Sequence, residues 1–131
     1  MAGTVVVDTV KSSTTGAPTF QNTSGTEIGQ LCRAWVSFNG SGSSYSVRGS
    51  FNISSVTRTG TGSFTVVMTN ALADANYSVL MGSPNYTGFG NGLWNLVSPT
   101  PTSTTFYILY TGNSFTTPTD PNLPSSIAVF R

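Results

Sequence analysis

The stretch Tyr45–Ser54, which reads YSVRGSFNIS, decides the class of fold. With serine, asparagine and arginine between them, its apolar side chains fall at alternate positions: Tyr45, Val47, Phe51 and Ile53. Because successive side chains of a strand point to opposite faces, this alternation predicts a half-buried antiparallel strand. Gly49 falls on the apolar face without a side chain, which predicts a bend or a bulge there.

Outward from this stretch, alternation recurs in short runs separated by turn residues. The runs are SFTVVMT (63–69), NYSVLMG (76–82), LWNLV (93–97), TFYILY (105–110) and SSIAVFR (125–131). RTGTGS (58–63) predicts one hairpin, and SPTPTST (98–104) predicts a second between LWNLV and TFYILY. No run has the i, i+3, i+4, i+7 pattern of an amphipathic helix. Many short strands at short spacing predict an all-β fold, an antiparallel β-sandwich of jelly-roll-like type.

The composition favours a folded domain and excludes two classes of partner. Of the 131 residues, 7% are charged and the net charge is +1, whereas about 25% are charged in an average soluble protein. Disordered segments are poor in aromatic residues, and this chain has eight Phe, five Tyr and two Trp. The cations are scattered, so we expect neither nucleic acid nor an anionic membrane as a partner. No apolar run approaches the roughly 18 residues of a membrane helix.

The sequence offers no set of residues for catalysis or metal binding. Histidine, the most common general base, is absent, and Lys11 is the only lysine. Paired-carboxylate catalysis needs two neighbouring acids. The four carboxylates are well separated in the sequence: Asp8, Glu27, Asp74 and Asp120. Asp74-Ala-Asn76 begins like a calcium loop but lacks its later glycine and glutamate. We therefore predict that the protein is not an enzyme and binds no metal or cofactor.

The segment CRAWVSFNG (32–40) predicts a strand with two different faces. One face is apolar throughout and consists of Cys32, Ala34, Val36 and Phe38. We expect Cys32 to be buried and unreactive, because a free cysteine behaves as a small hydrophobic residue. The other face places Arg33 beside Trp35, where the guanidinium can lie against the indole. Arginine and aromatic residues are enriched in subunit interfaces, so we predict that Arg33 and Trp35 contribute to self-assembly.

The first 27 residues predict an extended N-terminal arm, followed by a β-sandwich domain over residues 28–131. TVVVDTV (4–10) carries apolar side chains on both faces of an extended chain, with Val5 and Val7 on one of them. A terminal segment obtains burial on both sides by adding to another sheet or by threading between subunits. We therefore predict that Val5 and Val7 take part in self-assembly. The following KSSTTGAPTFQNTSGTE (11–27) shows no clear element.

A second candidate surface lies in the glycine-rich segment GSPNYTGFGNG (82–92). The segment carries Tyr86 and Phe89, and Trp94 follows it. Aromatic side chains on a loop are candidates for binding a ligand at the protein surface. We therefore predict Tyr86, Phe89 and Trp94 as surface-loop binding residues.

Three segments together resemble a β domain that recurs in tail-fibre and other virion proteins of tailed bacteriophages, many of them marine or cyanobacterial. The segments are PTFQNTSGTEIGQL (18–31), CRAWVSFNG (32–40) and VRGSFNISSVTRTGTGSFTVVMTNALADANYSV (47–79). CRAWV and DANY are the most specific parts. The resemblance implies an all-β homotrimer on the virion surface, assembled in the host cytoplasm. It assigns no catalytic residues.

The resemblance leaves two functions open, and the short length of the chain favours one of them. A small trimeric capsid decoration or cement protein, whose arms reach across neighbouring subunits, fits a chain with about thirty residues ahead of the motif. Its partners would be further copies, the major capsid protein or other virion proteins. A tail-fibre tip or short fibre that recognises host glycan is favoured instead by Tyr86, Phe89 and Trp94. A bacterial adhesin is disfavoured, because MAGTVVVDTVK lacks the features of a signal peptide.

Overall fold

A computed structural model describes residues 3, 6–13, 18–40, 45–82, 93–96, 102, 104–111, 117–121 and 124–131. The chain divides into two compact units, Met1–Leu31 and Cys32–Arg131. The division falls four residues after the predicted one, because the second strand of a small hairpin belongs to the first unit. Each unit is described by itself below.

The first unit contains a short hairpin where the sequence predicted no element. Strands β1 (Phe20–Gln21) and β2 (Glu27–Gly29) pair antiparallel. Asn22 shapes the turn, since its Oδ1 accepts hydrogen bonds from the backbone N–H groups of Ser24 at 3.0 Å and Thr26 at 2.9 Å. This local bonding is typical of asparagine in turns, and it corrects the expectation for residues 11–27. Residues 6–10 form no strand.

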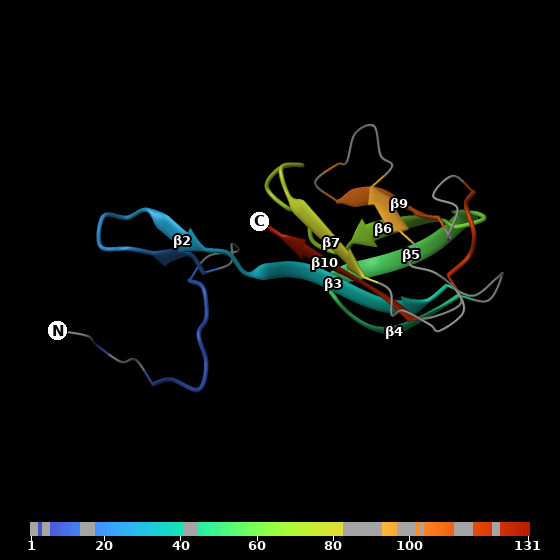
Figure 1. The fold of residues 1–131 in the computed structure, drawn as a ribbon. Coiled ribbons are helices and arrows are strands. Elements are labelled where there is room, and N and C mark those ends of the chain that lie inside the picture. Colours follow the sequence, from blue (N-terminus) through green and yellow to red (C-terminus); the bar gives the residue numbers. More distant parts are fainter. Residues whose placement is uncertain are drawn as a thin grey trace. The chain divides into compact units, whose positions relative to one another are not determined.

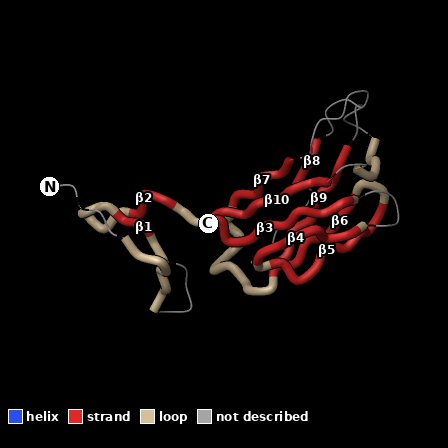
Figure 2. Tube along the Cα trace, turned by 90° about the horizontal axis from the view of Figure 1, so that it is seen from below, coloured by secondary structure: helices blue, strands red, loops and turns tan. Residues whose placement is uncertain are grey.

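The second unit consists of two four-stranded antiparallel sheets, drawn in Figures 1 and 2. The first sheet has the order β4-β3-β10-β7 and the second has the order β5-β6-β9-β8. The strands of the first sheet are β3 (Cys32–Asn39), β4 (Ser46–Phe51), β7 (Ser78–Gly82) and β10 (Pro124–Phe130). Those of the second are β5 (Ile53–Gly60), β6 (Ser63–Met68), β8 (Leu93–Leu96) and β9 (Thr105–Thr111). The described residues include no helix, so the all-β prediction is confirmed.

The apolar faces of the two sheets share one core, which is the arrangement of a β-sandwich. The predicted core face of β3 is confirmed for Ala34, Val36 and Phe38, which are fully buried. The Phe38 ring packs against Phe64 of the opposite sheet, with ring centroids 5.3 Å apart. Further buried side chains of the core come from strands of both sheets: Val66, Phe106, Ile108, Ile127 and Val129. The jelly-roll-like order stays a prediction.

The stretch Tyr45–Ser54 is not one strand, which corrects the first prediction made from the sequence. Asn52 adopts a positive φ of 54° and separates β4 in one sheet from β5 in the other. Its side chain fixes this crossing: Nδ2 donates to the backbone oxygen of Arg33 at 3.0 Å, and Oδ1 accepts from the backbone N–H of Asn70 at 2.8 Å. A register shift in β4 pairs Val47 with the buried Phe38 but Phe51 with the exposed Trp35. Phe51 is therefore exposed on the outer face, and Val47 is exposed because β4 is an edge strand.

The two hairpins predicted from turn residues are present. β5 and β6 pair around a tight turn at Thr61 and Gly62, so Arg58 and Gly60 belong to the strand instead of the turn. β8 and β9 pair antiparallel, with Leu93 opposite Thr111. Apolar alternation in β6 buries Phe64, Val66 and Met68, as the pattern predicted.

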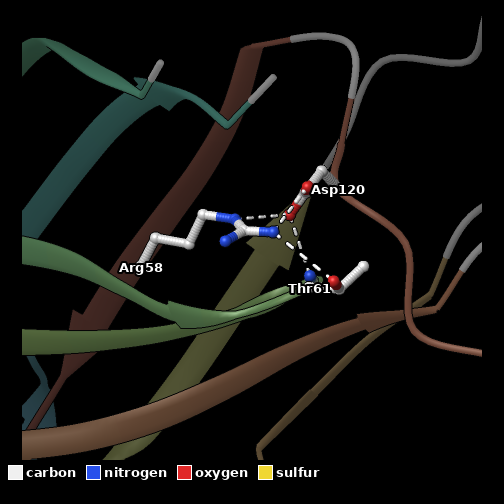
Figure 3. Close-up of polar contacts among 4 residues, drawn as sticks. Arg58, Thr61 and Asp120 are labelled. Carbon is white, nitrogen blue, oxygen red and sulfur yellow. Dashed lines mark hydrogen bonds and ion pairs between the residues drawn. The ribbon is translucent and has the colours of Figure 1, made fainter. Parts of the chain in front are cut away.

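An ion pair fastens the segment 117–121 to the β5–β6 turn (Figure 3). Asp120 accepts hydrogen bonds from Arg58 Nε and Nη2, both at 2.9 Å, and from the backbone N–H of Gly62 at 2.9 Å. The hydrogen bonds from Arg58 lower the pKa of Asp120 below its usual range. This carboxylate therefore acts as a structural clamp and is not free for chemistry.

A second ion pair joins the connection between β6 and β7 to the end of the described chain. Arg131 Nε donates to Asp74 Oδ1 at 2.9 Å, and Arg131 Nη2 also pairs with Asp74 Oδ2. Together with the backbone N–H of Asn76, these bonds lower the pKa of Asp74 from 3.8 to about 2. The Asp74 and Asn76 positions thus belong to a turn held by an arginine, and the calcium-loop resemblance has no further support here.

The Asp74 pair predicts a loss of stability in acid. A carboxyl group whose pKa is depressed in the folded state stabilises the fold above its unfolded pKa, and this contribution disappears as the pH falls through the folded pKa. We expect the melting temperature to fall between about pH 4 and pH 2, and Asp74→Asn to remove part of that fall. Melting followed by circular dichroism across this range measures it. Asp8→Asn is the control with the same charge change, and an equal effect of both variants would contradict the prediction.

Candidate interaction surface

The outward face of the first sheet carries a row of apolar side chains that crosses all four strands. Trp35 on β3 lies opposite Phe51 on β4 and opposite Ala128 on β10, which in turn lies opposite Leu80 on β7. Directly paired residues share a face of the sheet, so the four form one row. Trp35 is 42% exposed, Phe51 56% and Leu80 59%. We call the surface around this row of Trp35, Phe51, Ala128 and Leu80 the Trp35 face.

A hollow of about 470 Å³ lies on this face between Trp35 and Leu80. Its floor consists of small side chains, and those that face outward are Ser37, Gly82, Ser126 and Ala128. These small residues lie side by side because Ser126 of β10 is paired with Ser37 on one side and with Gly82 on the other. The Trp35 face therefore has the shape of a shallow apolar groove.

Two β-bulges interrupt the pairing of β3 and β4, and the extra residue in each is an arginine. In β3 the register shifts between Val129 and Phe130 of the partner strand, so that Arg33 is the extra residue. In β4 the register shifts between Gly49 and Val47, so that Arg48 is the extra residue. This confirms the bulge predicted near Gly49, and bulges often re-aim a side chain beside a functional site. Among the residues described, Arg33 does not stack on the Trp35 indole, because the bulge interrupts the alternation that would align them.

The charges of this face are not neutralised within the described part of the chain. The ion pairs there are Arg58 with Asp120 and Arg131 with Asp74. These pairs occupy both carboxylates of the second unit, since its only acidic residues are Asp74 and Asp120. Arg33 and Arg48 thus form no ion pair among the described residues, and arginine on the same sheet as an exposed tryptophan is a combination typical of protein interfaces.

The other predicted site residues are only partly within the described structure. Val5, Tyr86 and Phe89 lie outside the described residues. Val7 is exposed and belongs to no strand. Trp94 lies in strand β8, as the LWNLV pattern predicted, and is paired with Tyr110. Of the three predicted aromatic loop residues, only the backbone of Trp94 is described, so their shared role stays a prediction.

We expected Cys32 to be buried, but the structure shows it only partly buried. It stands at the bulged end of β3, where Phe130 is its partner. Its thiol donates a hydrogen bond to the backbone oxygen of Ala34 at 3.3 Å. The described residues contain no group of His, Cys, Asp or Glu that could hold a metal ion. No helix among them is long and apolar enough to cross a membrane.

Leu80 and Phe51 belong to the Trp35 face but were not predicted as site residues. Leu80 follows Val79 in NYSVLMG, and nothing in that run indicates its neighbours across the sheet. The missing information is the register of β7 and β4, which only the pairing reveals.

A comparison with protein-family models, curated proteins and solved structures found no match to this chain.

Proposed function

We propose that the protein is a bacteriophage virion structural protein, a homotrimeric decoration or cement protein that stabilises the capsid shell from the virion surface. The bacteriophage assignment rests on the sequence resemblance over CRAWV, DANY and their surroundings. The observation that carries the structural role is the exposure of apolar side chains on the Trp35 face and in the first unit. Large exposed apolar patches mark interaction sites.

The first unit supports an assembly role independently of the Trp35 face. A two-stranded hairpin is at best marginally stable alone in water. In the β1–β2 hairpin, Phe20 is 50% exposed and Ile28 is 66% exposed. A segment of this kind is stabilised when it packs on a partner, such as a neighbouring copy or a capsid protein. The proposal also agrees with the low charge of the chain, since 7% charged residues give a surface few means of resisting association.

We expect particles that lack this protein to lose heat resistance, because a cement protein adds contacts across capsomer junctions. The measurement compares genome release during heating for particles assembled with and without the chain. Adding the purified protein back should restore the wild-type release temperature. Mass spectrometry of purified particles should find hundreds of copies in each.

The same particles distinguish the alternative function. For a receptor-binding tip, particles without the protein should keep their heat resistance and lose adsorption to host cells. A few copies in each particle together with unchanged heat resistance would overturn the decoration proposal.

A further inference from the structure

We infer that the Trp35 face of one copy receives the N-terminal segment 6–10 of a second copy of the same chain. This inference rests on the proposed assembly role and specifies the contact that would join the copies. Identical copies that each donate a segment and each accept one form a head-to-tail interface, which closes into a ring when the rotation allows it.

The segment 6–10 has the apolar side chains that such a groove requires. In the single chain Val6 is 89% exposed, Val7 57% and Val10 69%. Removing exposed valine side chains from water is favourable, so these three residues favour any partner that covers them. The segment forms no strand or helix of its own, so it does not have to give up regular structure to bind.

The hollow on the Trp35 face suits an extended apolar segment. Trp35 and Leu80 stand on either side of a floor of small residues, which allows a backbone to approach. Among the described residues, the β-carbon of a residue at position 82 would meet no atom within 4 Å, so the hollow is open at this position.

The charges of the two partners are complementary. The first unit carries Asp8, Glu27 and Lys11, so its net charge is −2 + 1 = −1. The second unit carries four arginines and two aspartates, so its net charge is +4 − 2 = +2. Asp8 lies within the donated segment, and Arg33 and Arg48, on the strands β3 and β4 of the accepting sheet, form no ion pair among the described residues. Opposite charges at an interface favour encounter and fix the register of the partners.

The first test blocks the hollow without altering the core. Gly82→Val in the full chain fills the hollow, and the open space at position 82 allows the domain to fold. We expect the dissociation constant of self-association, measured by sedimentation equilibrium, to rise at least about 10-fold. Ser78→Val, on the same face of β7 but outside the hollow, should leave it unchanged. Trp35→Ser is a second variant of the face, and circular dichroism checks that each variant is folded.

The second test mixes two variants that each fail to assemble for a different reason. Replacing Val6, Val7 and Val10 with serine spoils the donated segment but keeps the groove, whereas Gly82→Val keeps the segment but blocks the groove. Each variant alone should remain monomeric. A mixture should form a 1:1 complex, because the segment of one variant can occupy the groove of the other.

Three results would overturn the inference: a wild-type chain that stays monomeric, a Gly82→Val variant that assembles with wild-type affinity, or a mixture that forms no 1:1 complex. These results are distinguishable from failure of the proposed function. Unchanged heat resistance of particles that lack the protein would refute the decoration role even if the 1:1 complex forms. Assembly that is indifferent to the groove would refute the inference even if the protein stabilises the shell.

Discussion

Replacing Phe38 with alanine is expected to lower the free energy of unfolding by about 3–5 kcal/mol, the range for removing a buried phenylalanine from a core. Phe38 is 0% exposed and its ring centroid lies 5.3 Å from that of Phe64. The two rings come from different sheets, so the substitution leaves a cavity at the junction of the layers. Neither sheet can close it without moving its strands.

Urea unfolding of the full chain, followed by tryptophan fluorescence, measures this change. Tyr107→Ala is the matched control, because Tyr107 is an aromatic residue on β9 that is 45% exposed. We expect the control to change the stability by less than about 1 kcal/mol. Equal effects of the two substitutions would show that Phe38 does not join the sheets as described.

Gly62→Ala is expected to cost at least about 2 kcal/mol of folding free energy, because strain in the backbone and a steric clash act together. Gly62 has a φ of +68°, which residues with a side chain rarely adopt. A β-carbon there would lie 2.5 Å from the backbone oxygen of Tyr110 and 2.7 Å from that of Thr119. Backbone atoms cannot rotate away as a side chain can, so the turn itself has to move.

Movement of this turn also weakens the clamp at Asp120, which accepts the Gly62 N–H. Gly60→Ala is the control two residues away, since its nearest contact would be Ser63 Cβ at 3.8 Å. We expect thermal unfolding to show a much larger decrease for Gly62→Ala than for Gly60→Ala. A similar decrease in both would mean that the turn is free to relax and that the clamp does not restrain it.

The sequence predicted those parts of the fold that depend on local alternation. In β3, Ala34, Val36 and Phe38 alternate without interruption, and the structure buries them as the pattern predicted. The prediction was wrong for Tyr45–Ser54, because alternation continues across Asn52 although the chain changes sheets there. A positive φ at one asparagine leaves no mark on the hydrophobic pattern.

The candidate surface was predictable in part. Arg33 and Trp35 were selected because their side of β3 is neither apolar throughout nor an ordinary polar face. Phe51 and Leu80 join Trp35 only through pairing between strands distant in the sequence. The ion pair between Arg58 and Asp120 could not be predicted for the same reason, since the two residues are 62 positions apart. Register between distant strands depends on the whole core, so local patterns do not reveal it.

The position of β10 determines when the Trp35 face comes into existence. β10 lies between β3 and β7 in the first sheet (Figure 2), yet it follows both of them in the chain. Its Ser126 and Ala128 provide part of the floor of the hollow. Before β10 inserts, β3 and β7 are not neighbours, and the groove has neither a floor nor a fixed width. Pairing between segments distant in the sequence is intrinsically slow, so we expect recognition between copies to wait until each domain is complete.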